Sequence, residues 1–257
     1  MTTQGNERET LAEGSLISHL MELRDRLLRS VIAVAVLFVP CAYFQNRLYT
    51  LIALPLLSKL PQGASMIATS PVSPFLVPLK LAFMTALFLA MPYVLYQAWA
   101  FVAPGLYRHE KRFAVPLVVS SVVLFYCGIA FAYFVVYPLM FDFLATSGPD
   151  GVAFTPEISE YLDFVLLLFL AFGIAFEVPV ATVLLAATGL VKIETMTKNR
   201  GYVVLGIFIV AAFLTPADAI SQSLMAVPMW FLYEAGVIMS RIMLKDREQR
   251  KAQAEAE

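Results

Sequence analysis

Six apolar runs separated by short polar segments dominate the chain. They cover residues 27–44, 79–101, 113–141, 161–188, 202–214 and 220–239. A run of about 20 apolar residues is long enough to cross the hydrocarbon core of a bilayer, and an isolated span there must be a helix because no water satisfies its backbone. The pattern therefore predicts an all-α polytopic membrane protein with six transmembrane helices, forming a single membrane domain over residues 1–257.

The two ends of the chain and the entry to the first run have different patterns. Residues 1–14 and 245–257 are polar without apolar periodicity, and we expect both segments to be disordered. Residues 15–28 place leucines on one helical face and charged residues on the other, which predicts an amphipathic helix at the membrane interface. Glu22 and Arg26 are four residues apart, so they could also simply pair on its surface.

Composition supports a membrane protein, and charge gives its orientation. The chain has 257 residues, of which 60% are hydrophobic and only 14% are charged, and this excludes an ordinary soluble domain. All Lys and Arg residues except Arg47, Lys59 and Lys80 fall on one side of the predicted spans. Because cytoplasmic loops carry the excess of Lys and Arg, we predict that both termini are cytoplasmic.

The fifth run is short, Gln222 and Glu234 interrupt the sixth, and prolines lie within several runs. Residues 202–214 would form a helix of only about 20 Å, against a hydrocarbon core of about 30 Å. We expect this region to thin the bilayer or to need a partner helix. Prolines such as Pro92 and Pro179 should bend their helices and shape a concave bundle.

Glu177 is the only charged residue in the apolar segment 164–189. A carboxylate at this depth costs a few kcal/mol on insertion and therefore indicates a functional site. It could be the proton or substrate site of a secondary transporter or channel, although such proteins usually carry several ionisable groups along a path. We interpret it instead as the contact for an inserted helix, without a satisfied polar match until that helix arrives.

The loop YQAWAFVAPGLYRHEKR, residues 96–112, is the second candidate site. Glu110 is its only acid among three bases, and it either pairs with those neighbours or joins Glu22 in receiving a cationic ligand beside the membrane. The turn at Pro104 and the aromatic residue Phe101 place this loop at the membrane interface.

The sequence offers no catalytic or nucleotide-binding pattern. His19 and His109 both fall on the predicted cytoplasmic side, and Cys41 and Cys127 lie in apolar runs without the spacing of metal ligands. No GxxxxGK[ST] phosphate-binding motif is present. We therefore expect no enzyme activity, no cofactor and no nucleic-acid partner.

Four segments resemble the TatC family, the large multi-span subunits of the twin-arginine protein translocase. They are HLMELRDRLLRS from His19, the loop at 96–112, FEVPV from Phe176, and LTPADAISQSLMAVPMWFLYE from Leu214. The resemblance covers residues 15–241, nearly the whole chain, with the motifs in the same order. It implies a translocase subunit of the cytoplasmic (inner) membrane that recognises twin-arginine signal peptides on folded precursor proteins and uses the proton-motive force.

The resemblance also implies partners and residue roles. The partners are the single-span subunits TatA and TatB, further copies of the chain itself, and membrane lipid. The residues assigned to signal-peptide binding are Glu22, Leu23, Arg24, Phe101, Arg108 and Glu110. Those assigned to partner-helix or intramembrane contacts are Glu177, Thr215, Asp218 and Gln222. Structural roles are expected for four prolines, Pro55, Pro92, Pro104 and Pro179.

Overall fold

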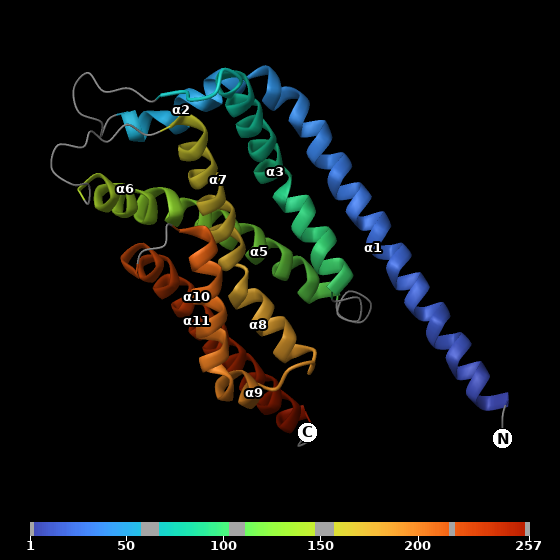
Figure 1. Cartoon of the computed structure of the whole chain (residues 1–257). Helices are drawn as coiled ribbons and strands as arrows, with labels where there is room; N and C mark the ends of the chain where they lie inside the picture. Colours follow the sequence, from blue (N-terminus) through green and yellow to red (C-terminus); the bar gives the residue numbers. More distant parts are fainter. Residues whose placement is uncertain (1–2, 58–66, 103–110, 147–156, 216–218, 255–257) are drawn as a thin grey trace.

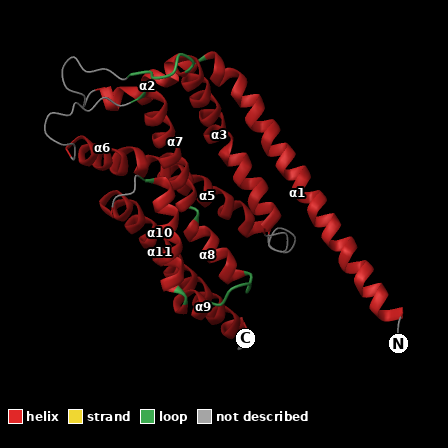
Figure 2. Ribbon diagram, viewed as in Figure 1, coloured by secondary structure: helices red, strands yellow, loops and turns green. Residues whose placement is uncertain are grey.

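A computed structural model of the protein describes residues 3–57, 67–102, 111–146, 157–215 and 219–254 (Figure 1). The elements in chain order are α1 (Thr3–Tyr43), α2 (Gln45–Leu57), α3 (Ser73–Val102), α5 (Lys111–Phe131), the π-helix η1 (Ala132–Val136), α6 (Tyr137–Thr146), α7 (Ile158–Ala175), α8 (Val178–Ala187), α9 (Ile193–Lys198), α10 (Arg200–Leu214) and α11 (Ala219–Ala254). Within these ranges no segment forms a strand (Figure 2), and the only extended pairing is one bridge between Ile67 and Glu157. The predicted all-α class is confirmed.

Five stretches of the described chain are long and apolar enough to cross a membrane. They are Ile17–Tyr43, Ser73–Val102, Val115–Phe141, Ile158–Ala187 and Ala219–Lys245. The third stretch runs through α5, η1 and α6, and the fourth joins α7 to α8. The protein is therefore an integral membrane protein that crosses the bilayer several times.

The helix expected to make the remaining span is short. α10 has 15 residues, so it is about 22 Å long and does not reach across a hydrocarbon core of about 30 Å. It packs against α11, a much longer helix. The six-span count stays a prediction, while the shortness of this helix agrees with the apolar run at 202–214.

The ends of the chain differ from the prediction of disorder. α1 begins at Thr3 and α11 continues to Ala254, so residues 3–14 and most of 245–257 are helical. Once a span has nucleated a helix, adding residues costs little, and no proline precedes Pro40 to stop α1. The C-terminal tail consists mainly of Ala, Gln, Glu, Lys and Arg, which are strong helix formers.

The segment 15–28 is also not a separate interfacial helix. It is part of α1, which runs without interruption into the first span (Figure 1). α1 packs mainly on α3, where Ala82, Ala86 and Ala90 are buried against it. These small side chains follow each other every four residues and allow the two helices to approach closely. The amphipathic segment is therefore placed beside the C-terminal part of α3.

α7 occupies the middle of the bundle and holds its main core (Figure 1). Phe172 is fully buried there, together with Met140, Phe169 and Met225. A Cβ on Gly128 of α5 would stand 2.5 Å from the carbonyl oxygen of Phe172, so α5 and α7 touch backbone to backbone at this glycine.

The outer helices diverge from this centre. α2 lies across one end of the bundle, and from there α1 and α3 lean away from α8 and α11 (Figure 1). The beginning of α1 and the end of α11 lie toward the same end of the molecule. One of the two polar sites described below joins α1 to α3, and the other joins α3 and α5 to the junction of α7 and α8.

Candidate functional site

The fourth transmembrane stretch is broken at Phe176 and Glu177, between α7 and α8. Pro179 has no amide proton and its ring conflicts with the carbonyl four residues earlier, so α7 ends at Ala175. From Pro179 we predicted only a bend, but the helix is interrupted here. The Glu177 amide donates to the Ile174 carbonyl at 3.0 Å, and its carbonyl accepts from the Ala181 amide at 2.9 Å. Glu177 thus closes one helix and opens the next.

The Glu177 carboxyl group belongs to a hydrogen-bonded chain through three elements. Trp99 Nε1 of α3 donates to Ser121 Oγ of α5 at 2.7 Å, and Ser121 Oγ donates to Glu177 Oε2. Oε1 is buried and, in the part of the chain that the structure describes, has no hydrogen-bond partner. We expected the carboxyl group to lack any polar match before a helix docks, and this is wrong for Oε2 because Ser121 reaches it.

Sequence reasoning missed the roles of Trp99 and Ser121. Trp99 lies in the loop segment 96–112 and Ser121 in the apolar run 113–141, and the sequence alone singled out neither residue. One signal was present in the sequence, namely a serine within the apolar run 113–141, which precedes the run of Glu177. A hydroxyl group buried in such a run needs a hydrogen-bond partner, and Ser121 is indeed fully buried. The pairing itself depends on the packing of α5 on α7 and α8.

The second polar site joins α1 to α3. Arg26 donates to Glu22 Oε1 from Nη2 at 2.6 Å and from Nε at 2.9 Å, so the surface pairing considered for these residues is present. Arg26 Nη1 also donates to Gln97 Oε1 at 3.1 Å, and Gln97 is buried in α3. The Glu22 side chain is nevertheless 39% exposed, so its carboxylate still faces the surroundings.

An apolar groove of about 230 Å³ lies beside this ion pair, between α1 and α3. Leu23 and Phe101, both predicted to bind a signal peptide, line it, and so does Arg26. The ring of Phe101 stacks on His19 with centroids 4.3 Å apart. The structure therefore brings together the carboxylate of Glu22, the buried amide of Gln97 and an apolar groove.

Helix α3 serves both polar sites. Gln97 points to Arg26 of α1, whereas Trp99, two residues later, points to Ser121 of α5. Residues two apart on a helix are separated by about 200°, so the last turns of α3 necessarily face both neighbours. The acid on α1 and the carboxyl group at the α7–α8 break are thus connected through one helix.

The other predicted signal-peptide residues lie outside this cluster. Arg24 is exposed and pairs with Asp25 at 2.9 Å. Arg108, Glu110 and Pro104 lie outside the described residues, so their arrangement stays a prediction.

Two of the predicted partner-contact residues have hydrogen bonds inside the chain. Thr215 Oγ1 donates to the Ala211 carbonyl at the end of α10, and Gln222 Nε2 of α11 donates to the Phe208 carbonyl of α10, each at 2.9 Å. Gln222 therefore ties α11 to α10. Asp218 falls outside the described residues.

The remaining predicted prolines occupy two helices. Pro92 lies inside α3, which continues past it to Val102. Pro55 lies in α2, across the end of the bundle, and its side chain is not described. Their expected structural roles remain predictions.

Comparison with known proteins gives one consistent family. The family model described as "Sec-independent protein translocase protein (TatC)" matches residues 18–228. The TatC protein of Azotobacter chroococcum mcd 1 is 56% identical over 237 residues, which are 92% of each chain. The TatC protein of Escherichia coli (strain K12) is 55% identical over 226 residues, 88% of each chain.

Solved structures agree. The crystal structure of a "Twin Arginine Translocase Receptor- TatC" has a TM-score of 0.79 and 36% identity, over 87% of this chain and 98% of that one. A structure of the same receptor "in DDM" gives 0.80 and 37%. The match to residues 18–228 contains both polar sites, and it supports a translocase subunit rather than a secondary transporter or channel. The chain belongs to the TatC family, the Sec-independent protein translocase subunits of the twin-arginine pathway.

Proposed function

We propose that this chain is the membrane receptor for twin-arginine signal peptides on folded precursor proteins. With TatA, TatB and further copies of itself, it would move these precursors across the cytoplasmic membrane without acting as an enzyme. The observation that carries the proposal is the Glu22 carboxylate beside the apolar groove that Leu23 and Phe101 line. A signal peptide has a cationic start followed by an apolar stretch, and these two features match the acid and the groove.

The contacts of Glu22 support arginine recognition. Glu22 already holds the Arg26 guanidinium through Oε1, while Oε2 receives no hydrogen bond within the described residues. An incoming guanidinium can therefore bind at Oε2 or replace Arg26, which would keep its bond to Gln97. Arginine offers a planar fork of donors, whereas lysine offers a single compact charge, so such a site should prefer arginine. Glu110 would supply the second acid for a pair of arginines, with Arg108 and Arg24 at its edge.

Glu177 would act later, when the apolar stretch inserts. Its Oε1 is buried without a partner in the described structure, and leaving such a group unsatisfied costs about 1–3 kcal/mol. A polar group on an inserted helix, from a signal peptide or a single-span partner, would recover this energy. Thr215, Asp218 and Gln222 fall in the sequence between the end of α10 and the first turn of α11, and they would form a second contact for TatA or TatB.

Orientation and energy source complete the proposal. The excess of Lys and Arg on one side supports an inner-membrane protein with both termini in the cytoplasm, so Glu22 would face newly made precursors. The sequence has no phosphate-binding loop of the GxxxxGK[ST] kind, and membership of the TatC family supports use of the proton-motive force. Local thinning of the bilayer beside the short α10 would assist passage.

Direct peptide binding tests the receptor function. The full-length chain in lipid nanodiscs should bind a labelled signal peptide with paired arginines at least about tenfold more tightly than its paired-lysine version, a difference of about 1.4 kcal/mol. Equal affinities for the two peptides contradict the proposal.

Substitution of the acids locates the receptor site. Glu22→Ala and Glu110→Ala should each abolish capture of a precursor while the protein still inserts into the membrane. Asp25→Ala is the matched control, because Asp25 is an exposed acid three residues from Glu22 that pairs only with its neighbour Arg24 in the described structure. If the Glu22 variant captures precursors as well as the Asp25 variant, Glu22 is only a surface ion-pair residue.

A further inference from the structure

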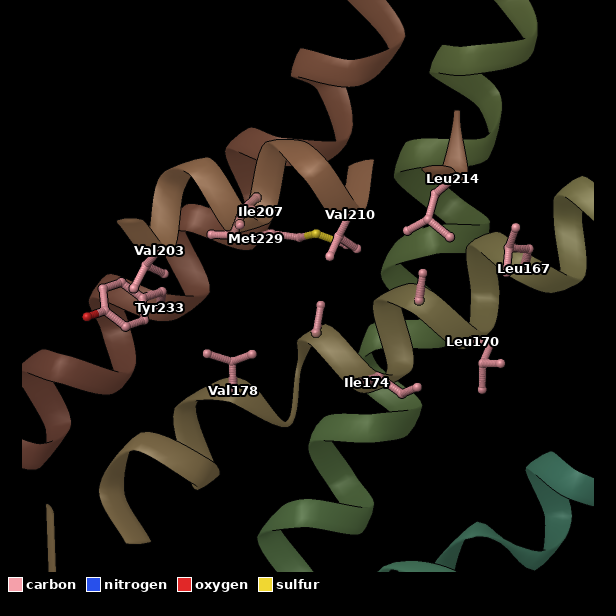
Figure 3. Close-up of a pocket in the computed structure, with 13 residues that line it drawn as sticks. Leu167, Leu170, Ile174, Val178, Val203, Ile207, Val210, Leu214, Met229 and Tyr233 are labelled. Atoms are coloured by element: carbon pink, nitrogen blue, oxygen red, sulfur yellow. The ribbon is translucent and has the colours of Figure 1, made fainter. Parts of the chain in front are cut away.

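A large apolar cavity lies beside the α7–α8 break, and none of the predicted site residues lines it. It has a volume of about 610 Å³ and is enclosed by α7, α8, α10 and α11 (Figure 3). Leu167, Ile174 and Val210 line it and are each 41–55% exposed, so the cavity opens to the surroundings of the protein. Those surroundings are hydrocarbon, because all three residues lie in apolar helices of a membrane protein.

The length and the apolar lining of the cavity limit what can occupy it. The stripe that α10 contributes extends from Val203 to Leu214, about 16 Å along the helix axis. Water is not favoured, because apolar cavities stay dry. A single acyl chain is thin enough, and the bilayer supplies it at high concentration.

One end of the cavity is marked by polar and charged groups. Arg200 stands three residues before Val203 and seven before Ile207, so it lies on the same face of α10 as the cavity wall. Its side chain is 45% exposed and donates from Nη2 to Glu234 Oε2 at 2.6 Å. Arg200 also begins a 15-residue helix, whose N-terminus carries positive partial charge. The neighbouring Tyr233 lines the cavity and donates its hydroxyl to the Met196 carbonyl.

The surface around this end is cationic. Residues 192–200, around α9, pack on residues 233–245 of α11, and these two segments together carry five bases against two acids. The bases are Lys192, Lys198, Arg200, Arg241 and Lys245, and the acids are Glu194 and Glu234. The Arg200–Glu234 pair is neutral by itself, so the remaining excess comes from the exposed lysines and Arg241. An anion at the membrane surface is therefore favoured beside the cavity.

We propose that the cavity is a binding site for an anionic phospholipid. One acyl chain would fill the space between α7, α8 and α10, and the phosphate would lie at Arg200 and the bases around it. Such a lipid would brace α10, the helix too short to cross the bilayer unaided. The site is separate from Glu22 and its groove, so it goes beyond the proposed receptor function and does not depend on it.

Lipid binding to the purified full-length chain tests the proposal. Phosphatidylglycerol and phosphatidylcholine with the same acyl chains are titrated in neutral detergent, and bound lipid is counted by native mass spectrometry. We expect phosphatidylglycerol to bind at least about fivefold more tightly than phosphatidylcholine, a difference of about 1 kcal/mol. Equal binding of the two lipids overturns the anionic site.

A cavity-filling variant separates specific from general lipid binding. Gly206 lines the cavity, and a Cβ there would meet nothing within 4 Å, so Gly206→Leu should fold and occupy the acyl site. Gly201 on the same helix is equally open but does not line the cavity, which makes Gly201→Leu the matched control. Gly206→Leu should lower the affinity for both lipids at least about fivefold, while Gly201→Leu should not. Identical binding by the two variants overturns the proposal.

The headgroup contact is tested by replacing the ion pair as a unit. Arg200→Gln combined with Glu234→Gln removes the guanidinium without leaving a half-buried carboxylate unpaired. This double variant should lower the preference for phosphatidylglycerol over phosphatidylcholine, with binding of phosphatidylcholine unchanged. A preference for the anionic lipid that is as large as in the unmodified chain would contradict the assignment of Arg200.

Crosslinking identifies the occupant in membranes. A photoreactive residue at position 206 of the assembled complex should crosslink to phospholipid. Crosslinking to a polypeptide instead would make the cavity a site for a partner helix and would overturn the lipid assignment.

Discussion

Ser121→Ala is the substitution that most directly probes the site around Glu177. Ser121 Oγ donates to Glu177 Oε2 and accepts from Trp99 Nε1, and Ser121 is completely buried. Removing this oxygen leaves the half-buried carboxyl group of Glu177 and the half-buried indole of Trp99 without these partners. The change therefore disconnects α3, α5 and the α7–α8 break in one step.

The magnitude follows from the two lost hydrogen bonds. A hydrogen bond contributes about 0.5–1.5 kcal/mol net and about 1.5–3 kcal/mol when one group is charged, whereas measured helix–helix hydrogen bonds in a membrane average about 0.6 kcal/mol. Two bonds to Ser121 should therefore contribute about 1–3 kcal/mol. For a chain of this size, each kcal/mol shifts the unfolding midpoint by about 2–4 °C, which predicts a decrease of roughly 2–12 °C.

The assay is thermal unfolding of the purified protein in detergent, with Ser120→Ala as the matched control. Ser120 is adjacent but exposed, and its hydroxyl donates only to the Leu117 carbonyl of its own helix. We expect the control to unfold within about 1–2 °C of the unmodified protein, as surface substitutions usually do. If Ser121→Ala is as stable as Ser120→Ala, the hydrogen-bonded chain from Trp99 to Glu177 is not a stabilising feature.

Three further predictions concern packing and ion pairs. Gly236→Ala would place a Cβ 2.1 Å from Thr182 Oγ1 and 2.8 Å from Pro179 Cα, so α8 and α11 must separate and the stability in detergent should fall by about 1–3 kcal/mol. Gly201→Ala, at a position with open space, should be neutral or stabilising, and an equal loss of stability in the two variants would contradict the close contact at Gly236. Arg200→Gln should destabilise the protein by about 1–3 kcal/mol, because it leaves the carboxylate of Glu234, only 17% exposed, without its partner. Lys80→Gln should cost less than about 1 kcal/mol because its partner Asp163 is half exposed, and a larger loss of stability for Lys80→Gln than for Arg200→Gln would contradict this reasoning. Glu177→Gln keeps an oxygen for Ser121 and should retain most precursor transport, whereas complete loss of transport would indicate a proton relay at this residue.

The apolar pattern predicted the helices well because the bilayer enforces it. Lipid leaves each apolar run no alternative to a helix, so α3, α7 and α8 lie close to their predicted positions. The ends were predicted less well, since polarity alone does not distinguish a disordered tail from a solvated helix that continues a span. α1 and α11 are the latter case.

The candidate sites show what packing adds to a sequence pattern. Glu22 with Arg26 was visible as an i, i+4 pair, and Glu177 stood out because it is alone in apolar sequence. Gln97 and Ser121 were not recognised, because their importance depends on which helices touch. Gln97 is 71 residues from Arg26, and Ser121 is 56 residues from Glu177. The lipid-sized cavity was not predictable at all, since its walls read as ordinary transmembrane sequence.

The central claim is that Glu22 recognises the paired arginines of a signal peptide, and a double-mutant cycle measures this most directly. Affinities of the paired-arginine and paired-lysine peptides are determined for the unmodified chain and for Glu22→Gln. We predict that the unmodified chain prefers arginine and that Glu22→Gln loses this preference, with a coupling energy of at least about 1.4 kcal/mol. A coupling energy near zero, with the arginine preference intact in Glu22→Gln, would contradict the account.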